Sequence, residues 1–132
     1  MCKERDIIIV DKYLKEGTPI SRHSFVILST ENGEIRGLPY DMICNVLSSF
    51  KDEEQRKRKM RYSGNFPIDN SNTSMMRGNT KDGYIKSEQF FYFKKDSISY
   101  EVIGEITEPT YEKLLEHIGK LDEINHIIDN LE

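Results

Sequence analysis

Apolar and β-branched residues recur in short runs over the first hundred positions, with turn-forming residues between them. "RDIIIVDKYL" and "HSFVILST" have the composition of buried strands. The segment "KEGTPIS" contains glycine and proline and is predicted to be a loop. In "ENGE", the Asn-Gly pair tolerates the positive φ of a tight turn, so it predicts a hairpin with "IRGL" as the returning strand.

A second group of runs follows this hairpin. "PYDMICNVLSS" is predicted to be a strand that ends at Ser48 and Ser49. "FKDEEQRKRKMR" contains helix-tolerant residues, with its acids first and its bases last, the order that favours the helix dipole. "NFPIDNSNT" is expected to be extended and "SMMRGNTKDG" to be a polar loop, whereas "GYIKSEQFFYFKKD" and "SYEVIGEI" are two more β-rich runs.

The hydrophobic period changes after Pro109. Apolar residues then recur at steps of three and four up to Leu131, which predicts an amphipathic helix over about 108–131. Gly119 interrupts the apolar stripe and marks a kink or a break between two helices. The pattern predicts one domain over 1–132: a mostly antiparallel β domain of six or seven strands, about 5–106, closed by the helix.

Composition limits the class of protein. The chain has 132 residues, 32% charged and 36% hydrophobic, as expected for a soluble globular domain. No apolar run approaches the ~20 residues that cross a bilayer, and the four-residue run "IIIV" is too short for the core of a signal peptide, so a cytoplasmic location without membrane contact is expected. The cysteines and histidines have no metal-ligand spacing, so neither a metal nor a cofactor is predicted.

Charge is distributed unevenly along the chain, whose net charge is −4. Residues 101–132 carry nine acidic and two basic side chains, which leaves a positive balance on residues 1–100. Within that part, residues 51–62 carry six bases and three acids. The basic run is either a solvated helix face or a contact for nucleic acid. Because the positive charge is confined to one segment, it indicates a local anion-binding surface and not a protein that is basic over its whole surface.

Polar residues next to two of the predicted strands could form a site. Arg22 and His23 precede "SFVIL", and Ser48 and Ser49 end "MICNVL". If these strands pair, an arginine that binds phosphate, a histidine that titrates near neutral pH and a serine hydroxyl meet at one rim. These are the parts of a metal-free site for phosphodiester chemistry on RNA, in which the 2′-hydroxyl attacks the adjacent phosphate. The alternative is structural: the Arg-His pair anchors a loop and the serines form a turn.

The order of the motifs resembles the MazF/PemK toxin family along nearly the whole chain. "DIIIVD" is followed by "SRHSFVILS" and "ICNVLSS", and "GYIKSEQFFYF" precedes "IGEITEPTYEKLLEHIGKL". The resemblance implies an SH3-like small β-barrel of the MazF/PemK/CcdB toxin type, a homodimer and cleavage of single-stranded RNA. It also implies a cognate antitoxin that occupies the RNA groove.

The resemblance also assigns residues. Arg22 falls on the catalytic arginine, Ser48 on the catalytic threonine and Gln89 on the glutamine of the late strand motif that supports the site. This chain departs from the family at His23, where proline is usual, at Ser48, which lacks the β-branched methyl group, and in its longer and more basic segment 50–62.

The leading hypothesis is therefore a metal-independent endoribonuclease. In it, Arg22 stabilises the phosphorane and protonates the leaving 5′-oxygen or orients its donor, Ser48 holds a non-bridging oxygen and His23 is the base. RNA contacts are expected from Lys15, Ser49, Lys51, Arg56, Lys57, Arg58, Lys59, Arg61, Lys86 and Gln89. Two alternatives remain open: a protein-binding toxin of the gyrase-poison type, which acts through its terminal helix, and a relative that binds RNA or a partner without cleaving it.

Overall fold

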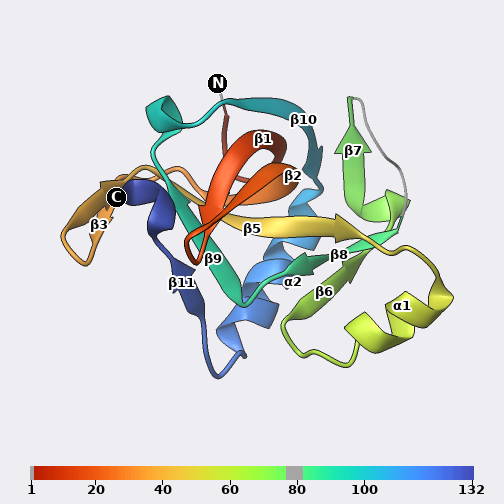
Figure 1. Cartoon of the computed structure of the whole chain (residues 1–132). Coiled ribbons are helices and arrows are strands. Elements are labelled where there is room, and N and C mark those ends of the chain that lie inside the picture. The colour runs from red at the N-terminus through yellow and green to blue at the C-terminus, as the bar shows by residue number, and fades with distance from the viewer. Residues whose placement is uncertain (1, 77–81) are drawn as a thin grey trace.

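A large, mostly antiparallel β-sheet and two helices make up the protein (Figure 1). The computed structural model describes residues 2–76 and 82–132. The strands are β1 (Asp6–Lys15), β2 (Thr18–Ser29), β3 (Gly33–Ile35), β4 (Leu38–Tyr40), β5 (Met42–Ser49), β6 (Asn65–Ile68), β7 (Thr73–Met75), β8 (Gly83–Lys86), β9 (Gln89–Phe93), β10 (Tyr100–Ile106) and β11 (Asn125–Ile127). The helices are α1 (Glu53–Lys59) and α2 (Glu108–Gly119), with short 3₁₀ turns at Asn70–Asn72, Lys95–Ser97 and Asp129–Leu131.

The main sheet has the order β11-β9-β5-β2-β1-β10-β7, and β8 joins β5 to β6. Among the described strands only β9 and β11 pair in parallel. The prediction of a mostly antiparallel β domain is confirmed, but the described residues contain eleven strands instead of six or seven, because runs such as "GYIKSEQFFYF" divide at a turn. Within residues 2–76 and 82–132, no ladder joins β7 to β11, so hydrogen bonding does not close the sheet into a barrel.

Hydrophobic side chains form two clusters because alternate residues of a strand point to opposite faces. On β2, Phe25 and Ile27 belong to a first cluster, which also contains Phe91 at 5.2 Å between ring centroids. Val26 and Leu28 belong to a second cluster on the other face. Both faces of this part of β2 are buried, which explains why four apolar residues follow one another there.

Two hairpin turns connect the first four strands, apart from the link between β2 and β3. Glu16 and Gly17, with φ values of 51° and 80°, connect β1 directly to β2, so the loop predicted over "KEGTPIS" is confirmed only at these two residues, and residues 18–21 belong to β2. Arg36 and Gly37, with φ of 51° and 81°, form the turn between β3 and β4. This is the two-residue geometry that favours glycine at a left-handed position.

The hairpin turn predicted at Asn32-Gly33 is therefore wrong. Gly33 instead opens β3 opposite Tyr40 on β4. A Cβ at Gly33 would overlap the Tyr40 ring, so this glycine permits a close approach between strands and does not form the turn.

The C-terminal helix is also shorter than predicted. Thr107 caps α2 by accepting a hydrogen bond from the Thr110 amide at 3.3 Å, and the helix ends at Gly119. The predicted helix over about 108–131 is wrong beyond that residue. Leu114 packs in the second cluster, whereas Ile127 on β11 packs in the first. The apolar stripe thus serves two separate clusters, which one straight helix could not reach.

Figure 1 shows α2 crossing behind the sheet and α1 at the edge of the molecule, near β6. The hydroxyl of Tyr111 on α2 donates to the carbonyl oxygen of Leu28 at 2.7 Å, which ties the helix to β2. Neither helix in the described part of the chain is long and apolar enough to cross a membrane.

Candidate catalytic and anion-binding site

The segments that carry the predicted site residues come together because β2 and β5 pair. Ser24 lies opposite Leu47 in this antiparallel ladder. Ser48 lies opposite Tyr84 in the neighbouring β5–β8 ladder. The pairing on which the predicted site depends is confirmed, but β2 begins at Thr18, so Arg22 and His23 lie within the strand and not at its start.

His23 and Ser48 project from the same face of the sheet. His23 shares its face of β2 with Phe25, and their ring centroids are 6.4 Å apart. Ser48 shares its face of β5 with Val46, and Phe25 and Val46 are cross-strand partners in the first hydrophobic cluster. The imidazole and the hydroxyl therefore lie at the rim of one cluster, both partly accessible to solvent.

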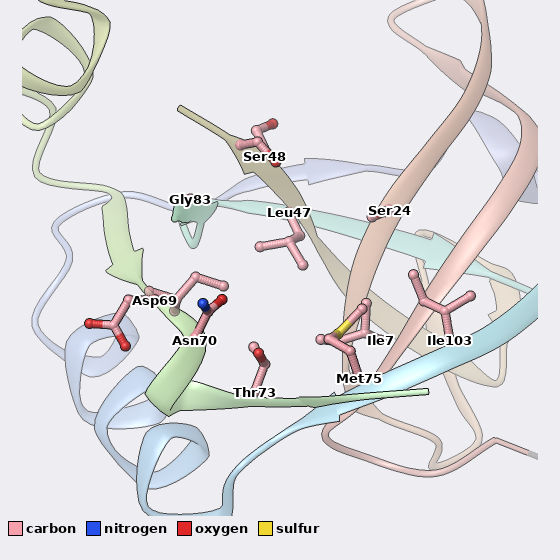
Figure 2. A pocket seen from close by; sticks show the side chains of 12 residues that line it. Ile7, Ser24, Leu47, Ser48, Asp69, Asn70, Thr73, Met75, Gly83 and Ile103 are labelled. Atoms are coloured by element: carbon pink, nitrogen blue, oxygen red, sulfur yellow. The ribbon is translucent and has the colours of Figure 1, made fainter. Parts of the chain in front are cut away.

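Arg22 and Ser49 follow the opposite alternation. Each is one residue along its strand from His23 or Ser48, on the face of Ser24 and Leu47. Figure 2 shows Ser48 on the side of β5 that faces away from Leu47. The structure thus brings Ser48 together with His23 and directs Arg22, which is exposed, away from it.

Two lysines act on the His23 ring through their charge. Lys86 lies two residues from Tyr84 on β8, so it projects from the face of Ser48. Burial, followed by the charges of Lys86 and Lys15, lowers the pKa of His23, against the opposing effect of a hydrogen bond with Ser24. Burial also lowers the pKa of Lys86, as do the charges of Lys15 and Lys59, while Glu88 opposes them. Lys15, His23, Lys59 and Lys86 are called the cationic cluster below.

The cationic cluster has no ion-pair partner in the part of the chain that the structure describes. The ion pairs found there join Lys3 and Arg5 to acidic residues near the N-terminus and in β10, and Arg56 to Asp82. Half-buried positive groups that repel one another without a counter-ion stabilise a bound anion. The cluster is therefore a candidate site for an anion, and His23 and Lys86 within it share the face of Ser48.

Helix α1 holds the basic run at the surface. The Asp52 carboxylate caps the helix by accepting from the Gln55 amide at 2.8 Å, and the acids precede the bases as predicted. No residue of α1 is buried. The helix predicted from the sequence is confirmed, and it is a solvated helix whose bases are available at the rim of the sheet.

The bases of this segment differ in their contacts. The Arg56 guanidinium lies 5.0 Å from the centroid of the Phe50 ring and 3.7 Å from the Asp82 carboxylate, so it is already engaged. Lys59 acts on Lys86 through its charge. The exposed bases are Lys51, Lys57, Arg58 and Arg61.

A small cavity of about 70 Å³ lies beside β5 and is lined by Ser24, Ser48 and Ser49 among others; Figure 2 shows Ser24 and Ser48 at this cavity. Its apolar lining includes Ile7 and Leu47, and its polar lining includes residues of the segment 69–73. Its volume is close to that of two molecules of water and smaller than a nucleobase. Nothing in the spacing of the sequence indicated this cavity, since the segment "NFPIDNSNT" is distant from these serines along the chain.

Gln89 lies at the start of β9 and supports the back of β5. Its carbonyl oxygen accepts a hydrogen bond from Nδ2 of buried Asn45 at 2.7 Å, and its backbone pairs with Asn125 on β11. The side-chain oxygens of Asn45 and Gln89 are buried, with no hydrogen bond among the described residues. This place beside the strand of Ser48 fits support of the site more closely than contact with RNA.

The other histidines and the cysteines lie apart from this site. His117 Nε2 contacts the carbonyl oxygen of Ser63 at 2.7 Å, and His126 Nδ1 contacts the Tyr92 hydroxyl at 2.7 Å. Burial raises the pKa of the Cys44 thiol well above its ordinary value. Residues 2–76 and 82–132 contain no group of three or more histidine, cysteine or acidic side chains placed to hold a metal ion.

The chemistry of the site follows from its groups. The Ser48 hydroxyl, the His23 imidazole and the Lys86 ammonium group on one face, with Lys15 and Lys59 acting through their charge, can hold a phosphate through hydrogen bonds and charge. They can also stabilise negative charge that develops on its non-bridging oxygens. In comparisons with known proteins, no family model and no curated protein matches the chain.

Proposed function

We propose that the protein is a metal-independent endoribonuclease of the MazF/PemK type that cleaves single-stranded RNA. One observation supports this above the others: His23 and Lys86 of the cationic cluster lie on the face of Ser48, where β2, β5 and β8 pair. RNA supplies the phosphodiester that such a cluster attracts. The bases of helix α1 extend the positive surface for the backbone of the RNA strand.

The reaction is a transfer of phosphate within the RNA. The 2′-oxygen attacks the adjacent phosphorus, the O2′–P bond forms and the P–O5′ bond breaks, while the 2′-hydroxyl proton passes to water and the 5′-oxygen gains a proton. The products are a cyclic phosphate and a 5′-hydroxyl. Ser48 and Lys86 bind non-bridging oxygens, whose charge increases in the transition state.

Arg22 has a different part in this proposal from the one that the sequence suggested. Arg22 projects from the face opposite to Ser48, so we do not assign it to the reacting phosphate. Because it is exposed and one residue from His23, we assign it to a neighbouring phosphate of the RNA backbone, where it positions the RNA strand. The contacts with the reacting phosphate then fall to Ser48, His23 and Lys86.

The finer description of the fold belongs to the same proposal. We infer an SH3-like small barrel of the toxin type, assembled as a homodimer, and a cognate antitoxin that covers the RNA-binding face. The second hypothesis, a gyrase-type poison, depended on a long terminal helix with an apolar stripe. Because α2 ends at Gly119 and Ile127 is buried in the core, the C-terminal segment does not form the long helix on which that hypothesis depended.

The test is incubation of the purified protein with a long single-stranded RNA in the presence of a chelator, followed by sequencing of the fragment ends. We expect cleavage that falls by about 10²- to 10³-fold in Ser48→Ala, the usual loss when a transition-state donor is removed. Ser74→Ala is the matched control, because Ser74 is an exposed serine on β7. Arg22→Ala should weaken RNA binding more than it slows the bound complex.

Two results would count against an enzyme. RNA that stays intact while it binds would identify a non-cleaving relative. Intact RNA together with inhibition of gyrase would identify the protein-binding toxin.

A further inference from the structure

The shorter of the two contacts that His23 Nδ1 makes with Ser24 favours one tautomer of the neutral ring. The Ser24 amide donates a hydrogen bond to His23 Nδ1 at 2.9 Å. A nitrogen that accepts a hydrogen bond carries no proton, so in the tautomer that this contact favours the proton of the neutral ring is on Nε2. No hydrogen bond of this Nε2 is found in residues 2–76 and 82–132, and in this tautomer Nε2 is a donor that cannot take up the 2′-hydroxyl proton.

The same backbone can also hold the protonated ring. His23 Nδ1 lies 3.3 Å from the carbonyl oxygen of Ser24, in addition to its contact with the Ser24 amide. A second proton on Nδ1 would replace an accepted hydrogen bond with a donated one to this carbonyl, after only a small movement of the ring. The imidazolium is thus compatible with the hydrogen bonds of the backbone, and what opposes it is first the burial of the ring and then the charges of Lys86 and Lys15.

The charges that face the ring come from two other strands. Lys15 from β1 and Lys86 from β8 both disfavour a positive imidazole. Lys59 at the end of α1 and Glu88 act on Lys86 with opposite signs. On its own strand, His23 contacts the Phe25 ring and the Ser24 backbone, neither of which carries charge. An anion bound among these lysines would reverse the balance at His23.

We propose that a phosphodiester bound among Lys15, His23 and Lys86 causes His23 to take up a proton, and that the charged ring is the acid for the leaving 5′-oxygen. The proposal rests on the proposed function for its natural ligand, an RNA phosphodiester. In the step, Nε2 gives its proton to O5′ as the P–O5′ bond breaks, and the neutral ring keeps its other proton on Nδ1. Exchange with water restores the starting tautomer.

Binding and protonation are linked in this site. An opposite charge within a few ångströms favours the charged form of a titrating group by about one pH unit or more. If the ligand raises the pKa of His23 by that amount, the same ligand binds about tenfold more tightly below both pKa values than above them. The rise in the His23 pKa on binding and the tighter binding to the protonated protein therefore measure the same coupling free energy.

The probe is the deoxydinucleotide dTpdT. It has one diester whose charge is constant between pH 5 and 8, and it lacks the 2′-hydroxyl and cannot be cleaved. We would follow the ring resonances of the histidines by NMR as a function of pH, with and without dTpdT. The expected result is a rise in the pKa of His23 by about one unit, with the His117 and His126 titrations unmoved. A His23 curve that is the same at saturating dTpdT would overturn the proposal.

Two variants make the test specific. Lys86→Gln should raise the pKa of His23 in the free protein and reduce the further rise caused by dTpdT. Ser48→Ala should lose cleavage and keep the coupling, so a failure of the proposed function and a failure of this inference give different results. Coupling that is unchanged in Lys86→Gln would contradict the assignment of the site.

The acid role has its own readout. His23→Gln should cleave RNA about 10²-fold more slowly, the usual loss for a general acid. A diester with a p-nitrophenolate leaving group needs no proton, so the variant should cleave it at close to the parent rate. Equal losses on the two substrates would show that His23 only supports the structure, and would exclude the acid.

Discussion

At the scale of the residue, His23 should make the stability of the protein depend on pH. Its pKa lies below the ordinary value of 6.5, chiefly because the ring is partly buried. The unfolded chain therefore takes up the proton at a higher pH than the folded one, and the contribution of His23 is complete above about pH 6.5 and is lost as the pH falls through the folded pKa. We expect the free energy of unfolding, measured with urea, to decrease from pH 7 towards pH 5.

The matched measurement uses His23→Gln. At pH 8 the difference in the free energy of unfolding between parent and variant gives the cost of the substitution itself, because His23 is uncharged in both the folded and the unfolded chain. Towards pH 5 that difference should shrink. Parallel curves for the parent and the variant over this range would assign the pH dependence to other groups.

How far single residues could be predicted depended on the strand alternation. From the sequence we predicted that the strands carrying Arg22, His23 and Ser48 pair, and the β2–β5 ladder confirms this pairing of strands. The sequence could not separate the faces of these three residues, because "FVIL" is apolar on both sides and hides the alternation that begins at His23. The proximity of Lys86 to His23 depends on the register of β8 against β5, which no local pattern encodes.

At the scale of the element, the C-terminal segment should hold the β1–β2 hairpin in place. The Asn130 side chain accepts from the Leu14 amide at 2.8 Å and donates to the Leu14 carbonyl oxygen at 3.0 Å, and Asp129 accepts from the Gly17 amide at 2.6 Å. Asn130→Ala removes two hydrogen bonds, so we expect a loss of about 1–2 kcal/mol of stability. Hydrogen exchange of the Leu14 amide should become faster, because this amide loses its acceptor, whereas the Gly17 amide keeps its hydrogen bond to Asp129.

Asn125→Ala is the control for this element. Asn125 is an exposed asparagine on β11, and its replacement should leave exchange at the hairpin unchanged. If Asn130→Ala affects stability but not the exchange of Leu14, then the segment stabilises the core through Ile127 and not through the hairpin.

The elements themselves were predicted where local signals agree with tertiary packing. The strands β1, β2 and β5 and the helix α1 follow from residue type and capping, and all four are present. The terminal helix failed past Gly119 because steps of three and four residues also occur when a chain leaves a helix and buries Ile127 in a different cluster. Similarly, Asn32-Gly33 is a sound turn signal, but the packing of Tyr40 against Gly33 placed the turn four residues later.

At the scale of the whole molecule, the distribution of charge should set the affinity for RNA without setting the rate of cleavage. Residues 101–132 carry nine acidic and two basic side chains, while Lys57 and Arg58 on α1 and Arg61 just after it are exposed bases of the segment that contains Lys59 of the cationic cluster. The triple variant Lys57→Ala, Arg58→Ala, Arg61→Ala should bind RNA more weakly. The plot of log affinity against log salt concentration should lose about 2 in slope, since each phosphate contact on a single strand contributes about 0.7.

The control carries the same change of net charge on another part of the surface: Lys94→Ala, Lys113→Ala, Lys120→Ala. If overall charge alone governs binding, the two triple variants will behave alike. If α1 is the path of the RNA backbone, only the α1 variant will lose salt dependence, and cleavage at saturating RNA will persist in both because Ser48, His23 and Lys86 are intact. A loss of cleavage in the saturated α1 variant would mean that the helix positions the scissile phosphate as well as attracting the strand.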